Sequence, residues 1–269
     1  MPGEPDPQYV RARRVLLDAA DALAAHLDSV VLVGAQAVYL HTGEAELFDA
    51  AAPYTTDADL AIGPADLADS PLLDELLIRR GFTLRESPGR WVSPDGIYVD
   101  LMVPEALAGP GSRGARLGPH GKRVARRAKG LEAALVDREP IEIQALDPSD
   151  SRNVTMHVAG QGALVVAKVH KIAERSSASD RMSDKDALDM LRLLQATDTD
   201  YLAKRLDELR SHELSAVVTA EAIGHLEPLF GSVDATGVAM AVRAAGPNAA
   251  PDTIAASLTA LVPDLLSAL

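Results

Sequence analysis

The chain has 269 residues, of which 47% are hydrophobic and 24% charged, a balance typical of a globular protein with a sizeable core. Its apolar runs are too short and interrupted to cross a bilayer, and the stretch MPGEPDPQYVRARR lacks the apolar core of a signal peptide, so no membrane contact and a cytoplasmic location are expected. The net charge of −13 argues against a surface built as a whole for nucleic acid, and the absence of cysteine excludes disulfides and thiolate metal sites.

The N-terminal half predicts alternating helices and strands. Apolar periodicity and breakers indicate a helix over 8–27, a strand at VVLV, a short helix closed by Gly43, a loop over 44–56, a strand at DADLAI and a helix over 64–80. The segments FTLRE, RWVS and GIYVDLMV follow with SPG and SPDG between them, which predicts an antiparallel meander.

Residues 111–130 form a basic segment with seven Lys and Arg, from Arg113 to Lys129, and no acidic residue. One interpretation is a solvated loop, or an arm that pairs with the acidic body. The other is a segment that follows the phosphates of an RNA, because clustered cations gain from counterion release. No aromatic residue lies within it, so base stacking is not indicated.

After this segment, IEIQAL and NVTMHV predict two short strands, and from Gly160 onward the pattern is helical, with helices over 161–175, 182–196, 199–210 and Ala-rich helices to Leu269. The sequence therefore predicts an α+β fold in two domains, a mixed sheet with flanking helices over 1–158 and a helical bundle over 159–269.

Three aspartates stand out within the predicted strands. Asp57 and Asp59 are two apart in DADLAI and so point to one face, and Asp100 lies in GIYVDLMV, a strand able to pair beside them. Clustered carboxylates repel each other unless a cation balances them, and oxygen-only ligation suits Mg²⁺ or Mn²⁺. The alternative is that Asp57 begins a turn, Asp59 is solvated and Asp100 ends a strand at the surface.

The order of VVLV, Gly34, a short helix and a strand with two aspartates resembles the core of the polymerase-beta-like nucleotidyltransferases. In that superfamily a turn of small residues lets backbone amides approach nucleotide phosphates, and carboxylates from two strands hold the metal ions. The resemblance implies metal ligands at Asp57, Asp59 and Asp100 and a nucleotide site that includes Gly34, Ala35 and Thr56.

The stretch VVAKVHKIAERSSASDRMSDKDALDMLRLL resembles the helical signature of AbiEii-type nucleotidyltransferase toxins. Lys168 matches its lysine, Arg175 its arginine, Lys185-Asp186 its basic-acidic pair and Asp189 its last acid. The resemblance implies that Lys168 binds the triphosphate, with Lys171 beside it one helical turn on and Asp186 positioning the lysine. An ordinary pair of charged surface helices is the alternative.

The chain also departs from the family pattern. Ala35 stands where the family has Ser or Gly, and the arginine expected shortly before the first aspartate is absent near Pro53. Thr55 and Thr56 offer hydroxyls instead, although Thr in a strand is commonly structural.

Three functions remain open. The first is transfer of a nucleotide from an NTP to RNA, with tRNA the expected acceptor, by the toxin of a toxin–antitoxin pair whose antitoxin is the expected protein partner. The second is nucleotide transfer to a small cationic compound such as an aminoglycoside, which an acidic body attracts. The third is a non-catalytic module of the same fold, which the departures favour.

Overall fold

A computed structural model describes residues 5–43, 54–175, 181–246 and 249–269, with only the backbone described over 181–183. The expected loop over 44–56 lies mostly outside these ranges. The α-helices are α1 (Pro7–Ala22), α2 (Gly34–Thr42), α3 (Leu73–Arg79), α4 (Glu132–Val136), α5 (Gln161–Arg175), α6 (Arg181–Ala196), α7 (Thr199–Ser211), α8 (Ala216–Phe230), α9 (Thr236–Ala245) and α10 (Pro251–Ala268). The strands are β1 (Val30–Val33), β2 (Asp57–Ile62), β3 (Thr83–Leu84), β4 (Arg90–Val92), β5 (Tyr98–Pro104), β6 (Arg126–Ala128), β7 (Arg138–Gln144) and β8 (Asn153–Ala159).

The strands form one mixed sheet with the order β3-β4-β5-β2-β1-β8-β7, and β6 pairs with β5. The predicted antiparallel meander is confirmed for β3, β4 and β5. The strand β5 returns to lie parallel to β2, and β8 lies parallel to β1. The non-local β2–β5 pairing sets the Asp57 segment beside the Asp100 segment.

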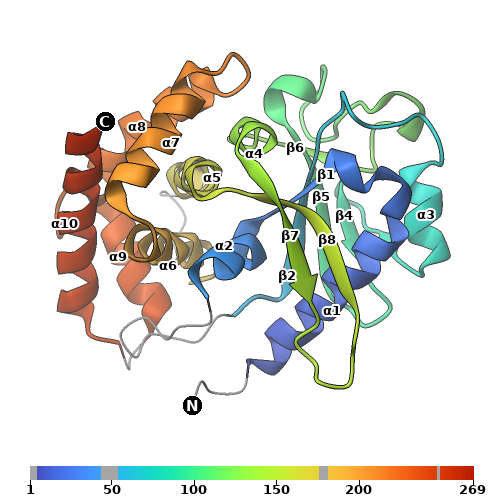
Figure 1. Ribbon diagram of the computed structural model, residues 1–269, viewed down its shortest axis with the longest axis horizontal. Coiled ribbons are helices and arrows are strands. Elements are labelled where there is room, and N and C mark those ends of the chain that lie inside the picture. Colours follow the sequence, from blue (N-terminus) through green and yellow to red (C-terminus); the bar gives the residue numbers. More distant parts are fainter. Residues whose placement is uncertain (1–4, 44–53, 176–180, 247–248) are drawn as a thin grey trace.

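Helices cover both faces of the sheet. Figure 1 shows α1 and α3 on one side of it, α2 and α5 on the other, and the remaining C-terminal helices beyond α5. The last strand ends at Ala159 and every later described element is a helix, as the periodicity predicts. The buried apolar side chains nevertheless form one cluster that runs through both halves, from Leu32 in β1 to Phe230 in α8. The division into two domains stays a prediction.

Local sequence explains where several elements begin and end. The Asp6 carboxylate accepts hydrogen bonds from the amides of Gln8 and Tyr9 at the start of α1, with Pro7 as the first helical residue. Gly43 ends α2 with a φ of 70°, which favours glycine.

Three expectations about elements need correction. The helix expected over 64–80 is only α3, because Pro71 lacks an N–H and disfavours helical backbone at Ser70. The helix expected over 8–27 ends as an α-helix at Ala22, and a 3₁₀-helix over Ala24–Ser29 follows. The short strand β6 was not expected within the basic segment, since its residues Arg-Arg-Ala show no apolar alternation.

No helix in the described ranges combines the length and the apolar character needed to cross a membrane.

Candidate active site

The three predicted aspartates lie on one face of two adjacent strands. In the parallel register of β2 and β5, Asp59 pairs directly with Asp100, and Asp57 lies two residues earlier on β2. Directly paired residues and residues two apart share a face, while Ala58 and Leu60 are buried on the opposite face. The strand pairing expected from the sequence is confirmed. Asp57 is the first residue of β2, and Asp100 lies within β5 rather than at its end, so the alternative for Asp100 does not hold.

This arrangement disfavours the charged form of two of the carboxylates. Burial, and then the neighbouring Asp57, raise the pKa of Asp59. Burial and Asp59 raise the pKa of Asp100 in the same way. One oxygen of Asp100, Oδ1, is buried without a hydrogen-bond partner among the described residues. Carboxylates in such surroundings favour a nearby cation.

Asp57 has a different environment. The Thr55 hydroxyl donates a 2.9 Å hydrogen bond to Asp57 Oδ1, and Gln36 Nε2 donates to the Asp57 backbone carbonyl at 3.0 Å. Thr55 is fully buried, whereas Thr56, the predicted nucleotide contact, is half-buried. Thr55 therefore positions Asp57, and a contact between Thr56 and a nucleotide stays a prediction.

Gly34 brings the start of α2 against the carboxylates. It has a φ of 73°, and a Cβ atom built on it lies only 2.2 Å from Asp59 Oδ2. Glycine is therefore the residue that this approach requires. The positive end of the α2 dipole lies beside a carboxylate as a result, which is favourable. The next residue, Ala35, is buried.

We expect Gly34→Ala to lower the free energy of unfolding by about 2 kcal/mol or more, because left-handed backbone alone costs an L-residue about 1–2 kcal/mol and the methyl group also meets Asp59. Gly96→Ala is the matched control, since Gly96 has a φ of 80° and a Cβ atom built on it meets nothing within 4 Å. Urea unfolding of both variants separates the two causes. Equal losses would show that the contact with Asp59 contributes nothing.

The helical half contributes a buried cluster of charges around Lys168. Its ammonium lies 2.6 Å from Asp186 Oδ1 and 2.6 Å from Asp189 Oδ2, and Lys168 is 3% exposed. Burial lowers the pKa of Lys168, but the two carboxylates outweigh burial and raise it. The expected contact between Asp186 and Lys168 is present. Because two carboxylates already hold the ammonium, its contact with a triphosphate stays a prediction.

Lys171 and Arg175 lie beside this cluster and are more accessible. Their cationic groups approach Asp186 Oδ2 at 3.4 and 3.1 Å, and their side chains are 37% and 40% exposed. Lys185, next to Asp186 in α6, turns elsewhere, with its ammonium 6.0 Å from the centroid of the Tyr39 ring. Among the cations that contact Asp186, Lys171 and Arg175 are thus more accessible to a ligand than Lys168 is.

Asp186 makes this cluster sensitive to acid. Burial raises its pKa, but Lys168 and Lys171 outweigh burial and hold the pKa below its ordinary value of 3.8. A carboxyl group whose pKa is lower in the folded chain than in the unfolded chain stabilises the fold at pH values above its unfolded pKa. This stabilisation is lost as the pH falls from the unfolded pKa toward the folded pKa. We therefore expect Asp186→Asn to be less stable than wild type at pH 7, with the difference shrinking below pH 4. A constant difference down to pH 2 in thermal unfolding would contradict this linkage.

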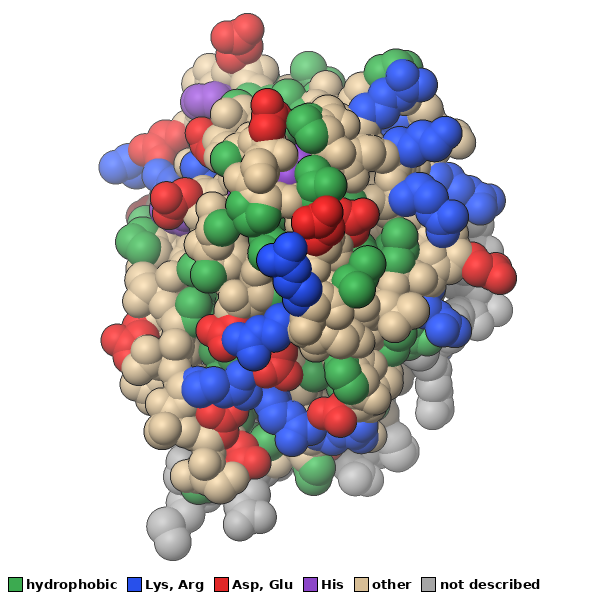
Figure 2. All heavy atoms as spheres, turned by 90° about the vertical axis from the view of Figure 1, so that its right-hand side faces the viewer, with side chains coloured by type: hydrophobic (Ala, Val, Ile, Leu, Met, Phe, Trp, Pro, Cys, Tyr) green, Lys and Arg blue, Asp and Glu red, His purple; other side chains and the backbone are tan. Residues whose placement is uncertain are grey.

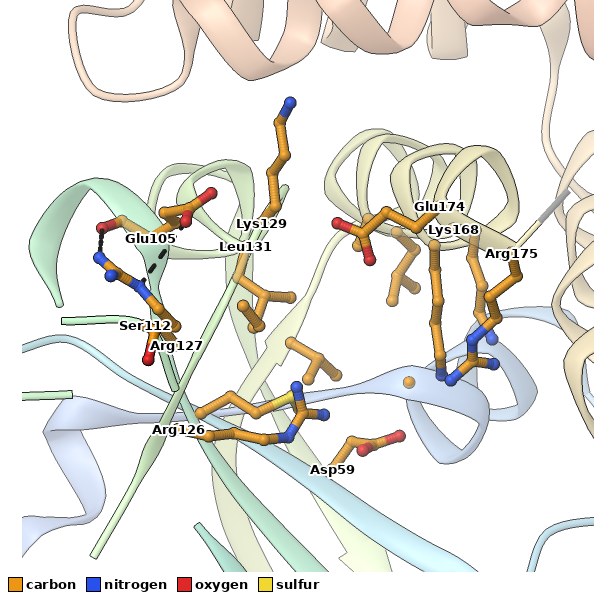
Figure 3. Close-up of a pocket in the computed structure, with 17 residues that line it drawn as sticks. Asp59, Glu105, Ser112, Arg126, Arg127, Lys129, Leu131, Lys168, Glu174 and Arg175 are labelled. Atoms are coloured by element: carbon orange, nitrogen blue, oxygen red, sulfur yellow. Dashed lines mark hydrogen bonds and ion pairs between the residues drawn. The ribbon is translucent and has the colours of Figure 1, made fainter. Parts of the chain in front are cut away.

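A cleft of about 250 Å³ joins the two halves of the site. Its lining includes Gly34 and Asp59 from the sheet side and Lys168, Lys171 and Arg175 from α5. Figure 3 shows Lys168 and Arg175 extending from the helix toward the strand that carries Asp59, while Lys129 points away from it. Among the described residues, Ala35, Thr56, Asp57 and Asp100 do not line this cleft. With six Lys and Arg against three acidic residues, the lining suits a polyanion.

Sequence reasoning missed the role of Arg126. This residue begins β6, where its backbone pairs with Met102, and its Nη2 lies 3.2 Å from Asp100 Oδ2. It also lines the cleft and lowers the pKa of Asp59 and of Asp100. Only the long-range pairing of β5 with β6 reveals this position, which no local pattern signals.

The rest of the basic segment divides in two. Arg127 pairs with Glu105 at 3.6 Å and Lys129 with Glu221 at 2.8 Å, as the interpretation of an arm against the acidic body requires. Four cations instead line a surface hollow of about 320 Å³ without an acidic residue in the lining: Arg113, Arg116, Lys122 and Arg123. Figure 2 shows Lys and Arg side chains gathered at one edge of the face it displays, whereas acidic and basic side chains mix elsewhere on that face. Ser112 lines both this hollow and the cleft.

The donor atoms suit a hard divalent cation. Asp57, Asp59 and Asp100 offer only carboxylate oxygens, and Asp100 Oδ1 is left without a partner in the described part of the chain. As the described side chains stand, however, no three His, Cys, Asp or Glu residues form a group that could hold a metal ion. Asp100 is instead engaged by Arg126. The chemistry of the donor set therefore fits Mg²⁺ or Mn²⁺, with Arg126 already placed at the other oxygen of Asp100, Oδ2.

Comparison with known proteins adds no relative: no family model matches the chain, and no curated protein matches it.

Proposed function

We propose that this protein is a nucleotidyltransferase with a polymerase-beta-like core, similar to the AbiEii-type toxins, that transfers a nucleotide from an NTP to RNA. The observation that carries the proposal is the pairing of Asp59 with Asp100 beside Gly34, where Asp59 and Gly34 line a cleft rich in Lys and Arg. Carboxylates from neighbouring strands next to a glycine turn are what the superfamily resemblance implies.

Each part of the site has a role in this proposal. Asp57, Asp59 and Asp100 would hold Mg²⁺ or Mn²⁺, which supplies charge stabilisation at the α-phosphate and at the pyrophosphate leaving group. Gly34 allows the start of α2 to approach the phosphates. Lys171 and Arg175 neutralise the triphosphate, and Lys168 with Asp186 and Asp189 fixes α5 against α6 so that these cations stay in place.

RNA is the acceptor that the surface favours. The four cations of the hollow lined by Arg113 and Lys122 lie next to the cleft through Ser112, and they suit successive phosphates of a backbone. A tRNA is the acceptor we propose, in a toxin–antitoxin setting where a cognate antitoxin blocks the activity.

A second acceptor class is favoured by a separate observation. A hollow of about 580 Å³ shares Glu105 and Lys129 with the cleft, and four glutamates line it: Glu105, Glu132, Glu213 and Glu221. Such a lining suits an amine-rich compound, such as an aminoglycoside. This acceptor is the alternative within the same chemistry.

One experiment separates the acceptors. The purified protein is incubated with each NTP labelled at the α-phosphate, with Mg²⁺ or Mn²⁺, and with total tRNA or an aminoglycoside. Label in tRNA supports the proposal, and label in the aminoglycoside supports the alternative. Absence of transfer with every NTP and acceptor would favour a non-catalytic module.

A matched pair of variants tests the RNA surface. Replacing Arg113 and Lys122 by Glu should weaken tRNA binding and flatten its salt dependence, because phosphate contacts release counterions. Replacing Arg11 and Arg14 by Glu makes the same charge change on α1, where both side chains contact Asp95. Equal weakening by both pairs would point to net charge rather than to the hollow.

A further inference from the structure

Arg126 places its positive charge beside Asp100, one of the carboxylates of the site. Its guanidinium lies 3.2 Å from Asp100 Oδ2, with the Arg126 side chain 35% exposed and that of Asp100 16% exposed. Burial raises the pKa of Asp59 and of Asp100, and the positive charge of Arg126 lowers both pKa values. The guanidinium thus supplies in this structure the positive charge that a divalent cation would supply.

The other cations around the carboxylates are committed elsewhere. Lys168 is held by Asp186 and Asp189, and Lys171 approaches Asp186. Arg90, which is paired with Asp100 across β4 and β5, has its guanidinium 4.2 Å from the centroid of the Tyr98 ring. Arg126 is therefore the cation best placed to exchange between the carboxylates and a ligand.

We propose that Arg126 is an exchangeable counter-ion, which holds Asp100 while the site lacks a divalent cation and turns to a substrate phosphate once that cation takes Asp100. This inference rests on the proposed function and identifies a further substrate-positioning residue of that site. Arg126 lines the cleft and its side chain is 35% exposed, so the guanidinium is accessible to a phosphate bound there. A guanidinium pairs with phosphate oxygens as well as with carboxylates.

The proposal requires two opposite effects of one substitution. Arg126→Ala removes a competitor for Asp100, so divalent-cation affinity should rise about 3- to 10-fold, the range of a partly exposed ion pair. The same variant loses a phosphate contact, so affinity for a non-hydrolysable NTP analogue should fall by about the same factor. A residue that only supports the fold would weaken both affinities together.

Binding measurements without turnover test this. Mn²⁺ affinity is measured by the paramagnetic resonance of free Mn²⁺, and analogue affinity by calorimetry at saturating Mn²⁺, for wild type, Arg126→Ala and Arg126→Lys. Arg80→Ala is the matched control, because Arg80 forms a surface pair with Asp21 at 2.8 Å. Arg126→Lys keeps the charge and should stay close to wild type in both measurements, and the control should equal wild type.

The double variant Asp100→Asn/Arg126→Ala tests the route of the effect. In the Asp100→Asn background, removal of Arg126 should no longer raise Mn²⁺ affinity, since the shared carboxylate is gone. Equal or lower Mn²⁺ affinity in Arg126→Ala, with wild type binding Mn²⁺, would overturn the exchange and leave the proposed function standing. Absence of Mn²⁺ binding in wild type and Arg126→Ala alike would overturn the metal site and the exchange together.

Discussion

Asp59→Asn is expected to reduce nucleotide transfer by a factor on the order of 10³ while the fold stays intact, because it removes a ligand charge where the metal contributes several kcal/mol. Asp59 is the one of the three aspartates that lines the cleft, and Gly34 closely approaches its carboxylate. The neutral amide also relieves repulsion with Asp57, so thermal stability should not fall.

The matched control for this variant is Asp21→Asn, which removes a surface carboxylate paired with Arg80. Transfer by both variants is measured with α-labelled NTP at saturating Mg²⁺, and thermal unfolding is followed by circular dichroism. Full transfer by Asp59→Asn would remove the metal role from this residue.

Lys168→Met should lower the free energy of unfolding by about 3 kcal/mol, because it leaves Asp189 and part of Asp186 buried without their ammonium. Lys171 and Arg175 still neutralise Asp186, which keeps the loss at the lower end for a broken buried pair. Lys171→Met should leave stability nearly unchanged and weaken nucleotide binding instead.

Urea unfolding and nucleotide titration of the two variants separate these roles. Lys204→Met is the control for stability, since the Lys204 side chain is 74% exposed and its ammonium is as far as 4.0 Å from Glu208 Oε1. This variant should change the free energy of unfolding by less than about 0.5 kcal/mol. Unchanged stability with lost nucleotide binding in Lys168→Met would show that this lysine serves the ligand directly, as the family resemblance implies.

The sequence predicted the elements that carry strong local signals. Runs such as VVLV and DADLAI are confirmed as strands, and the apolar periodicity after Gly160 predicts the C-terminal helices. The prediction was wrong where a proline interrupts a helical pattern at Pro71, and it missed β6, whose basic residues lack alternation. Such short strands depend on a partner strand rather than on their own residues.

The site was predictable only in part for the same reason. The spacing of Asp57 and Asp59 indicates a shared face, and the alternation around Asp100 predicts a strand able to pair with theirs, as the β2–β5 register confirms. The contacts of Arg126 with Asp100 and of Asp189 with Lys168 depend on packing between distant segments. Whether an ammonium faces a ligand or two carboxylates is decided by burial, which the pattern of a charged helix does not reveal.

The most direct test of the proposed chemistry compares one NTP labelled at the α-phosphate with the same NTP labelled at the γ-phosphate, each incubated with wild-type protein, Mg²⁺ and tRNA. Nucleotide transfer predicts that the α label enters the RNA and that the γ label leaves as pyrophosphate, and that Asp59→Asn slows both by a factor on the order of 10³. Entry of the γ label into the acceptor, or transfer by Asp59→Asn at the wild-type rate, would contradict the account.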